Sequence, residues 1–133
     1  VAKCADICNI GSEMSLEEHR AKLGVLERHC RDVGRDPAEI EVTHNARVII
    51  AENQRDFDSI AAQAASQASM SLSAFKQSIS GAIAGTPEQC IQQIEPYVQA
   101  GITYFLLIFP DPVPVESLQL FAKEVMPHFG SGD

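Results

Sequence analysis

The chain has 133 residues, of which 45% are hydrophobic, so it is long enough for one domain with one core and is not disordered. Its formal net charge is −8, from 18 acidic and 10 basic residues, which argues against nucleic acid or an anionic membrane as a partner. No apolar run approaches the roughly 20 residues that cross a bilayer, so we expect no membrane-spanning segment.

The four cysteines do not form the pattern of a metal site. Cys4 and Cys8 are separated by three residues, and no second pair of Cys or His accompanies them, as a zinc site would require. Cys30 and Cys90 fall on the apolar stripes of predicted helices, which is typical of reduced, buried thiols. We therefore expect no metal site and no disulfide, and a reducing, cytoplasmic location.

The first part of the chain predicts a strand followed by a helix. Residues 1–5 look like the last turn of a helix, and residues 6–10 predict a short strand. Ser15 and Glu18 have the spacing of a capping box and begin the next helix, which Gly34 ends. The buried face of this helix keeps a helical spacing through His19, Leu23, Leu26, Cys30 and Val33.

Residues 40–50 predict a second strand whose two faces differ in polarity. One face is largely apolar and carries Val42, His44, Ala46, Val48 and Ile50, whereas the other carries Thr43, Asn45, Arg47 and Ile49. A polar face is unusual for a parallel strand of an open sheet. It suits a strand that faces the inside of a barrel, or a cavity near a ligand.

Residues 53–84 predict a loose helical segment, with a second short helix over residues 72–83. The following helix has clear boundaries. Thr86 and Gln89 have the spacing of a capping box at its start, and Gly101 is a typical C-terminal glycine. We expect the box to satisfy the backbone donors of this helix start, which could otherwise bind an anion.

The apolar run at residues 104–109 predicts a strand buried on both faces, which is typical of a parallel sheet covered by helices. A last helix is predicted over residues 114–126. The order strand, helix, strand, helix pair, helix, strand, helix is a βα repeat and predicts an α/β fold with about three parallel strands. Two architectures remain open at this point: a slice of a (β/α)8 barrel, or a small doubly wound sheet.

Five phrases of the sequence carry a family resemblance, and they occur at Ala5–Asn9, His29–Ile40, Gly85–Gln89, Ala100–Phe105 and Leu120–Pro127. In this order and at these separations they resemble the C-terminal part of luciferase-like monooxygenases, which are flavin- or deazaflavin-dependent oxidoreductases on a (β/α)8 barrel. The resemblance covers nearly the whole chain except a Ser- and Ala-rich patch at residues 65–73. It implies that residues 1–133 form a single domain, a TIM-barrel-like fragment that holds the last three strands of the barrel.

The resemblance also implies a cofactor, either FMN or a deazaflavin, although most of the family's cofactor contacts would come from the missing strands. Barrel enzymes place their chemistry at the C-terminal ends of the strands. The candidate cofactor-binding residues are therefore Asn9 and Gly11, for which a simple turn after the strand is the alternative. Phe109 to Asp111 qualify by the same position, with a solvated turn as the alternative.

Other candidate residues favour structural roles. His44 lies early in its strand, away from the mouth of a barrel, and His19 lies on a buried helical stripe as a hydrogen-bonded core histidine. Arg47 either holds a phosphate or carboxylate in the barrel or pairs with a neighbour on a strand. The remaining histidines, His29 and His128, are expected on the surface.

Two functional hypotheses follow. The chain is a C-terminal fragment of a flavin- or deazaflavin-dependent monooxygenase or other oxidoreductase that is inactive alone, or it is a non-catalytic truncated barrel that self-associates. Three parallel strands leave open edges, which invite pairing with another chain. The expected partner is either a second copy in a homodimer or the missing N-terminal half of the barrel. The sequence does not indicate a substrate.

Overall fold

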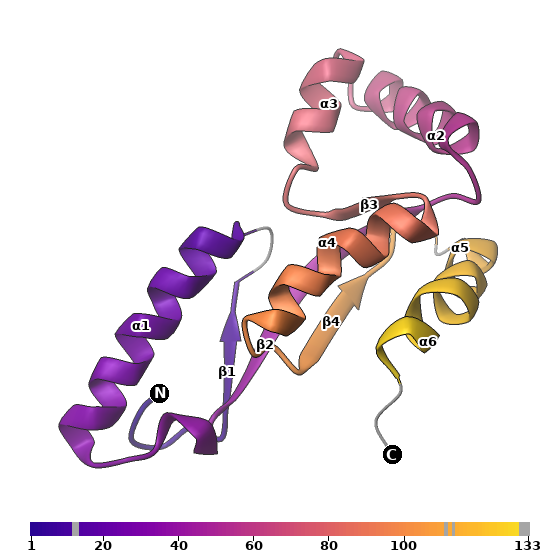
Figure 1. Cartoon of the computed structure of the whole chain (residues 1–133). Helices are drawn as coiled ribbons and strands as arrows, with labels where there is room; N and C mark the ends of the chain where they lie inside the picture. The colour runs from indigo at the N-terminus through magenta and orange to yellow at the C-terminus, as the bar shows by residue number, and fades with distance from the viewer. Residues whose placement is uncertain (12–13, 111, 113, 131–133) are drawn as a thin grey trace.

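The computed structural model describes residues 1–11, 14–110, 112 and 114–130 of the chain. The first half holds β1 (Ile7–Ile10), α1 (Leu16–Val33), the 3-10 turn η1 (Pro37–Glu39), β2 (Glu41–Ile50) and α2 (Gln54–Gln67). The second half holds α3 (Leu72–Ser78), β3 (Ile83–Gly85), α4 (Pro87–Gln99), β4 (Tyr104–Ile108), α5 (Val115–Leu120), the π-helical turn η2 (Phe121–Val125) and α6 (Met126–Phe129). Figure 1 shows these elements along the chain.

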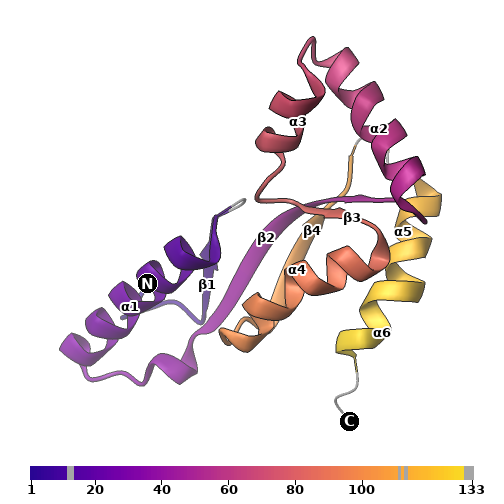
Figure 2. The same cartoon turned by 45° about the horizontal axis from the view of Figure 1, so that its top comes forward.

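The sheet is built around β2, which pairs in parallel with the other three strands. Residues 41–44 of β2 pair with β1, residues 43–47 pair with β4, and residues 48–50 pair with β3. The predicted α/β fold, with a parallel sheet flanked by helices, is therefore confirmed. The α2–α3 pair rises beyond the carboxyl ends of the strands in both views of the ribbon (Figures 1 and 2).

The prediction of a helix over residues 72–83 is wrong at its C-terminal end. Helix α3 ends at Ser78, and residues 83–85 form β3 instead. The backbone of this short strand finds its partners on the end of β2, and the N–H of Ala51 continues the pairing by donating to the carbonyl of Gly85 over 3.1 Å. These partners are distant in sequence, so the local pattern could not indicate them.

The last helix is also less regular than predicted. It extends past residue 126 to Phe129, and a π-helical turn interrupts it at residues 121–125. Pro127 follows that turn, and it has no N–H to donate to a carbonyl four residues earlier. The loss of this hydrogen bond accounts for the wider turn before it.

Both predicted capping boxes are present. The hydroxyl of Ser15 accepts from the N–H of Glu18, and the hydroxyl of Thr86 accepts from the N–H of Gln89. In return, the side chains of Glu18 and Gln89 accept from the backbone N–H groups of Ser15 and Thr86. Gly85, just before the second box, has a φ of +136°, and a Cβ there would collide with the Gln89 side chain. Glycine at position 85 thus allows the amide of Gln89 to reach the cap.

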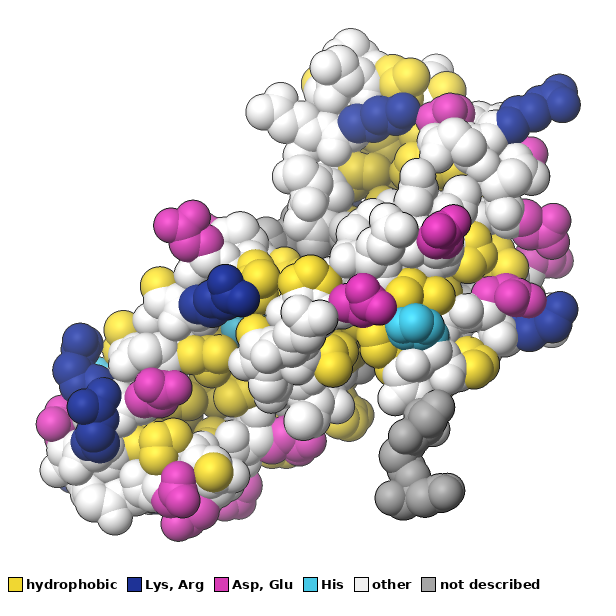
Figure 3. All heavy atoms as spheres, in the orientation of Figure 1, with side chains coloured by type: hydrophobic (Ala, Val, Ile, Leu, Met, Phe, Trp, Pro, Cys, Tyr) yellow, Lys and Arg dark blue, Asp and Glu magenta, His cyan; other side chains and the backbone are white. Residues whose placement is uncertain are grey.

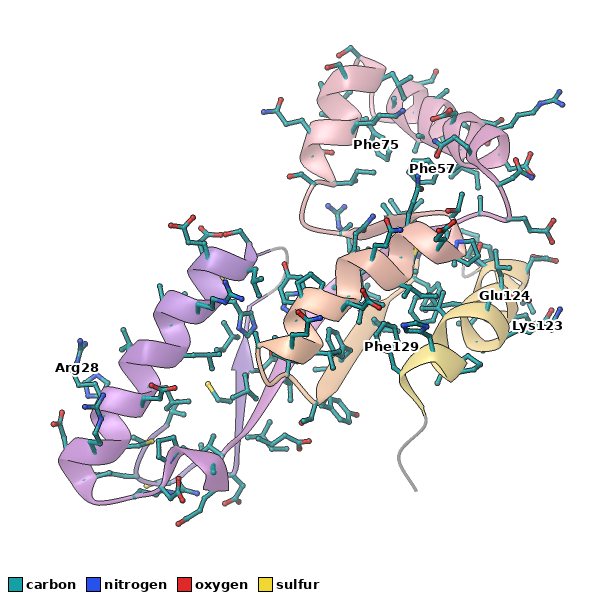
Figure 4. All side chains as sticks on the ribbon, in the orientation of Figure 1. Arg28, Phe57, Phe75, Lys123, Glu124 and Phe129 are labelled. Carbon is teal, nitrogen blue, oxygen red and sulfur yellow. The ribbon has the colours of Figure 1, made fainter. Side chains whose placement is uncertain are left out.

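The main core lies between the sheet, α4 and the C-terminal helices, and its buried members are Ala46, Val48, Ile50, Ile83, Cys90, Ile94, Phe121 and Val125. Figure 3 shows hydrophobic side chains between α1, α4 and α6 on this helix-covered side. Phe129 points from α6 toward the same core, and Phe57 and Phe75 pack between the α2–α3 pair and the sheet (Figure 4). The helix α4 and the C-terminal helices therefore bury one face of the sheet, whereas α2 and α3 pack on Ile49 and Ala84 at the carboxyl end of the other face.

Away from α2 and α3, this opposite face of the sheet is open. On this face Ile7 is 55% exposed, Tyr104 51%, Leu106 40% and Ile108 49%. We call it the open face, and its polar members are Asn9, Glu41, Thr43, Asn45 and Arg47, of which Thr43 is buried among its neighbours. Within the described residues, no helix combines the length and the apolar character that crossing a bilayer would require.

Candidate functional site

All strands of the sheet run in the same direction, so their carboxyl ends lie at one edge. In parallel α/β proteins this edge is where ligands bind. Asn9 and Gly11 stand at this end of β1, as predicted, and Asn9 is exposed on the open face. No contact to a cofactor tests their role, so the assignment of these two residues remains a prediction.

Asn9 is held by a partner on the central strand. Its Nδ2 donates to Oδ1 of Asn45 over 3.1 Å, and the two amides join β1 to β2 across the open face. Further along β2, Nη2 of Arg47 donates to the carbonyl of Ser78 over 3.1 Å, which ties the strand to the end of α3. The polar side chains that the sequence predicts on one face of β2 therefore lie on the open face of the sheet.

An apolar cleft of about 470 Å³ lies at the same edge, between the end of β2, the α2–α3 pair and the segment that follows β4. Its walls include Ile49, Ile60, Phe75 and Pro110, with the amides of Gln63 and Gln67 and the hydroxyl of Ser117 as its polar groups. We call it the α2 cleft. It could hold a flat apolar ring, and its amides could fix the ring's polar edge.

Of the three residues that the sequence places after the last strand, the structure puts only Pro110 at this cleft. Phe109 directly follows β4, as expected, but its side chain is not among the residues that line the cleft. Its ring packs edge-on against Phe121 at 5.9 Å between centroids, because burial in the core removes a large apolar surface from water. Asp111 lies outside the described residues.

The start of α4 is closed by side chains, as predicted. The N–H of Thr86 donates to Oε1 of Gln89 over 2.9 Å, and Nε2 of Gln89 donates to Oε1 of Gln54 over 3.1 Å. The second hydrogen bond connects the first turns of α2 and α4. The amide of Gln89 therefore serves both the cap and this connection between helices.

His19 and His44 meet in the layer between helices and sheet. His19 is fully buried and His44 is 2% exposed, and their ring centroids lie 5.2 Å apart. Burial lowers the pKa of His44 to about 4, with the nearby His19 adding to the effect, and burial also lowers the pKa of His19. The predicted structural setting of both is confirmed, but the expected hydrogen bond of His19 is not, because neither ring nitrogen has a partner among the residues that the structure describes.

The cysteines are free thiols. Cys30 and Cys90 are buried, as predicted, and Cys4 is exposed. Burial raises the pKa of the Cys90 thiol to about 12, so this thiol is protonated at neutral pH and is a poor nucleophile. Among the residues that the structure describes, no three His, Cys, Asp or Glu side chains are grouped to hold a metal ion.

No protein-family model matches this chain, and a search of curated proteins finds no relative in sequence. Solved structures do match. A coenzyme F420 dependent tetrahydromethanopterin reductase from Methanopyrus kandleri matches with a TM-score of 0.66 and 16% identity over 96% of this chain and 46% of its own. The monooxygenase RslO1 from Streptomyces bottropensis matches with a TM-score of 0.65 and 18% identity, and the match covers 93% of this chain and 41% of RslO1.

A third match is a riboflavin lyase (RcaE) with modified FMN and riboflavin, at a TM-score of 0.69, 13% identity, and 96% and 39% coverage. These neighbours have the luciferase-like monooxygenase fold, and this chain spans less than half the length of each. At such identities the likeness shows the fold alone. The chain has the fold of part of a luciferase-like, TIM-barrel-like protein.

Proposed function

We propose that this chain is the C-terminal part of a flavin- or deazaflavin-dependent oxidoreductase that acts when its sheet is completed to a barrel. The proposal is carried by two features that agree: the chain matches only part of each similar structure, and one face of its sheet is left uncovered. The fold likeness spans nearly the whole chain but less than half of each neighbour, and the sheet face without helices exposes large apolar side chains. A face of that kind usually marks an interface.

The neighbours support the cofactor class. One is named for coenzyme F420, a second is an F420-dependent secondary alcohol dehydrogenase in complex with an F420-acetone adduct, and a third holds modified FMN. The α2 cleft suits the ring system of either cofactor, because it is apolar and carries amide groups. None of its described lining residues is charged, so the cofactor's phosphate groups would be held elsewhere.

In the completed protein the cofactor would supply hydride transfer or oxygen chemistry. The residues of this chain would bind and orient it. The walls of the α2 cleft would exclude water from the ring, and Gln63 and Gln67 would hydrogen-bond to its polar edge. The paired amides of Asn9 and Asn45 would fix the carboxyl end of β1 beside the cofactor.

The partner that completes the sheet is either the N-terminal half of the barrel or a second copy of this chain. β1 and β4 each pair only with β2 among the described strands, so each has a free edge. The same open face favours a second candidate function, that of a non-catalytic domain that self-associates. The two functions differ in whether the protein binds a cofactor.

Titration of the purified chain with FMN and with F420, followed by the fluorescence of the cofactor, separates the two functions. We expect weak, saturable binding of one of them, which Phe75→Ala reduces because this ring forms a wall of the α2 cleft. Leu72→Ala is the matched control, since Leu72 is exposed on the same helix and is not among the cleft residues. Lack of saturable binding by both cofactors would support the non-catalytic domain.

A further inference from the structure

Three rings, one each from α1, β2 and α4, pack against one another where these elements meet. His44 of β2 stacks on Tyr97 of α4, with centroids 4.5 Å apart and planes 20° apart. His19 of α1 meets both rings edge-on, at 5.2 Å from His44 and 6.0 Å from Tyr97, and Phe105 of β4 closes the group at 6.0 Å from His44. We call His19, His44 and Tyr97 the ring cluster.

The ring cluster buries polar atoms that have no partner. Both ring nitrogens of His19 and Nδ1 of His44 lack a hydrogen bond within the described part of the chain, and the two side chains are almost completely buried. A cavity of about 130 Å³ adjoins His44, Tyr97 and Phe105. Neutral imidazoles tolerate this setting, whereas a charged imidazole needs a hydrogen-bond acceptor or water, and none of the described residues accepts from these three nitrogens.

The ring cluster is also connected to the edge of the sheet that carries the candidate site. The hydroxyl of Tyr97 donates to the carbonyl of Met14 over 2.9 Å. Met14 comes directly before Ser15, the N-cap of α1, and shortly after Gly11 at the carboxyl end of β1. Tyr97 therefore fixes the point at which the chain leaves β1 and enters α1.

We propose that the ring cluster is an acid-sensitive latch, which holds α1 and Met14 against β2 and α4 while both imidazoles are neutral and releases them when an imidazole is protonated. Release would separate His19 from His44, since two imidazolium charges repel at this distance. It would also give the ring nitrogens access to water. The hydrogen bond from Tyr97 to Met14 would break with it.

Among the residues that the structure describes, few ionisable groups act on the latch. His19 is the ionisable group that acts on His44, and Glu18, in the turn before His19, acts on Tyr97. Glu18 is itself held by Ser15 and lies near Lys22 on α1. Apart from Tyr97, the residues of β4 and α4 that line the cavity beside His44 are Phe105, Gln93 and Ile94, which carry no ionisable side chain, and the same is true of residues 80–83.

The direction of the pH effect follows from the lowered pKa values. In the closed latch the pKa of His44 is about 4 and that of His19 is also lowered, while the ordinary value is 6.5. The open form therefore binds more protons between pH 6.5 and 4, so the closed form is fully stable above pH 6.5 and loses stability as the pH falls toward 4. For His44 alone the opening equilibrium shifts by roughly a hundredfold over this range.

Tyr97 fluorescence provides the test, because the chain has no tryptophan and two tyrosines. In a Tyr104→Phe background Tyr97 is the only fluorophore, and its access to a neutral quencher reports the opening of the latch. We expect access to rise at least tenfold between pH 7 and pH 4.5. The matched variant carries His19→Leu and His44→Phe as well, which keep an apolar residue on α1 and a ring against Tyr97, and its Tyr97 should stay protected.

The imidazole resonances of the unaltered chain give a second, independent measurement by NMR, with the exposed His29 and His128 as references within the same molecule. We expect His44 to titrate well below pH 6. The same pH range should bring the rise in the quencher access of Tyr97. An acid transition that is the same with and without the two histidines would overturn the latch. Protonation of His19 and His44 while Tyr97 stays protected would overturn it as well. If the double variant does not fold, the single variant His19→Leu and the NMR titration decide the question.

Discussion

Nδ2 of Asn9 donates to Oδ1 of Asn45 over 3.1 Å, and this hydrogen bond crosses from β1 to β2 on the open face of the sheet. The two strands are joined by only four residues of pairing, so a side-chain link near the end of β1 helps to set its position. Asn9 is also the candidate cofactor residue of that strand. The link therefore connects the stability of the sheet edge to the candidate site.

The first prediction concerns this pair. Asn9→Ala and Asn45→Ala should each lower the free energy of unfolding, and the double variant should show a coupling of roughly 0.5–1 kcal/mol, because the bond is exposed and competes with water. Urea unfolding of the unaltered chain, the two single variants and the double variant measures the coupling. Strictly additive effects would show that the bond does not form.

The second prediction concerns the glycine before α4. Gly85→Ala should destabilise the chain by about 1–3 kcal/mol, because φ is +136° and the new Cβ meets the Gln89 side chain that caps the helix. Gly24→Ala is the matched control, because its Cβ would enter open space within α1 and alanine is the better helix former. Thermal unfolding should show opposite signs for the two variants, and equal effects would contradict this account of the cap.

The sequence predicts the fold in outline because the main strands and helices carry local patterns. Alternation along β2 separates its two faces, and the capping boxes mark the starts of α1 and α4. β3 was missed since three residues carry too little pattern, and their partners on β2 lie far away in sequence. The π-helical turn has a local cause instead, since a proline changes the hydrogen bonding of the residues before it, and the spacing of apolar residues along the helix does not indicate this.

The candidate site was only partly predictable. Asn9 and Gly11 follow from their place at the end of a strand, but the α2 cleft depends on how α2 and α3 pack above the sheet. Its polar members, Gln63 and Gln67, belong to a helix rich in small residues, and a glutamine in such a helix does not by itself indicate a binding site. The partnerless nitrogens of His19 were equally hidden, since burial on a helical stripe says nothing of hydrogen bonding.

The third prediction concerns thiol chemistry. At pH 8 a disulfide exchange reagent should modify Cys4 rapidly and leave Cys90 unmodified, because Cys4 is exposed and burial raises the pKa of the Cys90 thiol to about 12. Cys4→Ser should remove the fast phase. Denaturant should then make Cys90 reactive. Rapid modification of Cys90 in the folded chain would mean that the core between α4 and the sheet does not bury it as described.

The fourth prediction concerns the open face. Leu106→Lys should weaken association with any partner that covers this face by roughly tenfold or more, because the lysine charge would lose its water at the interface. Val25→Lys is the control, since Val25 is similarly exposed but lies on α1. Sedimentation at several concentrations compares the two. If both variants weaken association equally, the contact does not involve the open face.

Light scattering of the isolated chain at micromolar concentration tests whether it is an incomplete barrel whose open face must be covered. The exposed Ile7, Tyr104, Leu106 and Ile108 make an isolated monomer unfavourable. The account predicts that the chain alone has the mass of a dimer or a larger assembly, and that Leu106→Lys lowers this mass. A compact, monodisperse species of 14.4 kDa would contradict it.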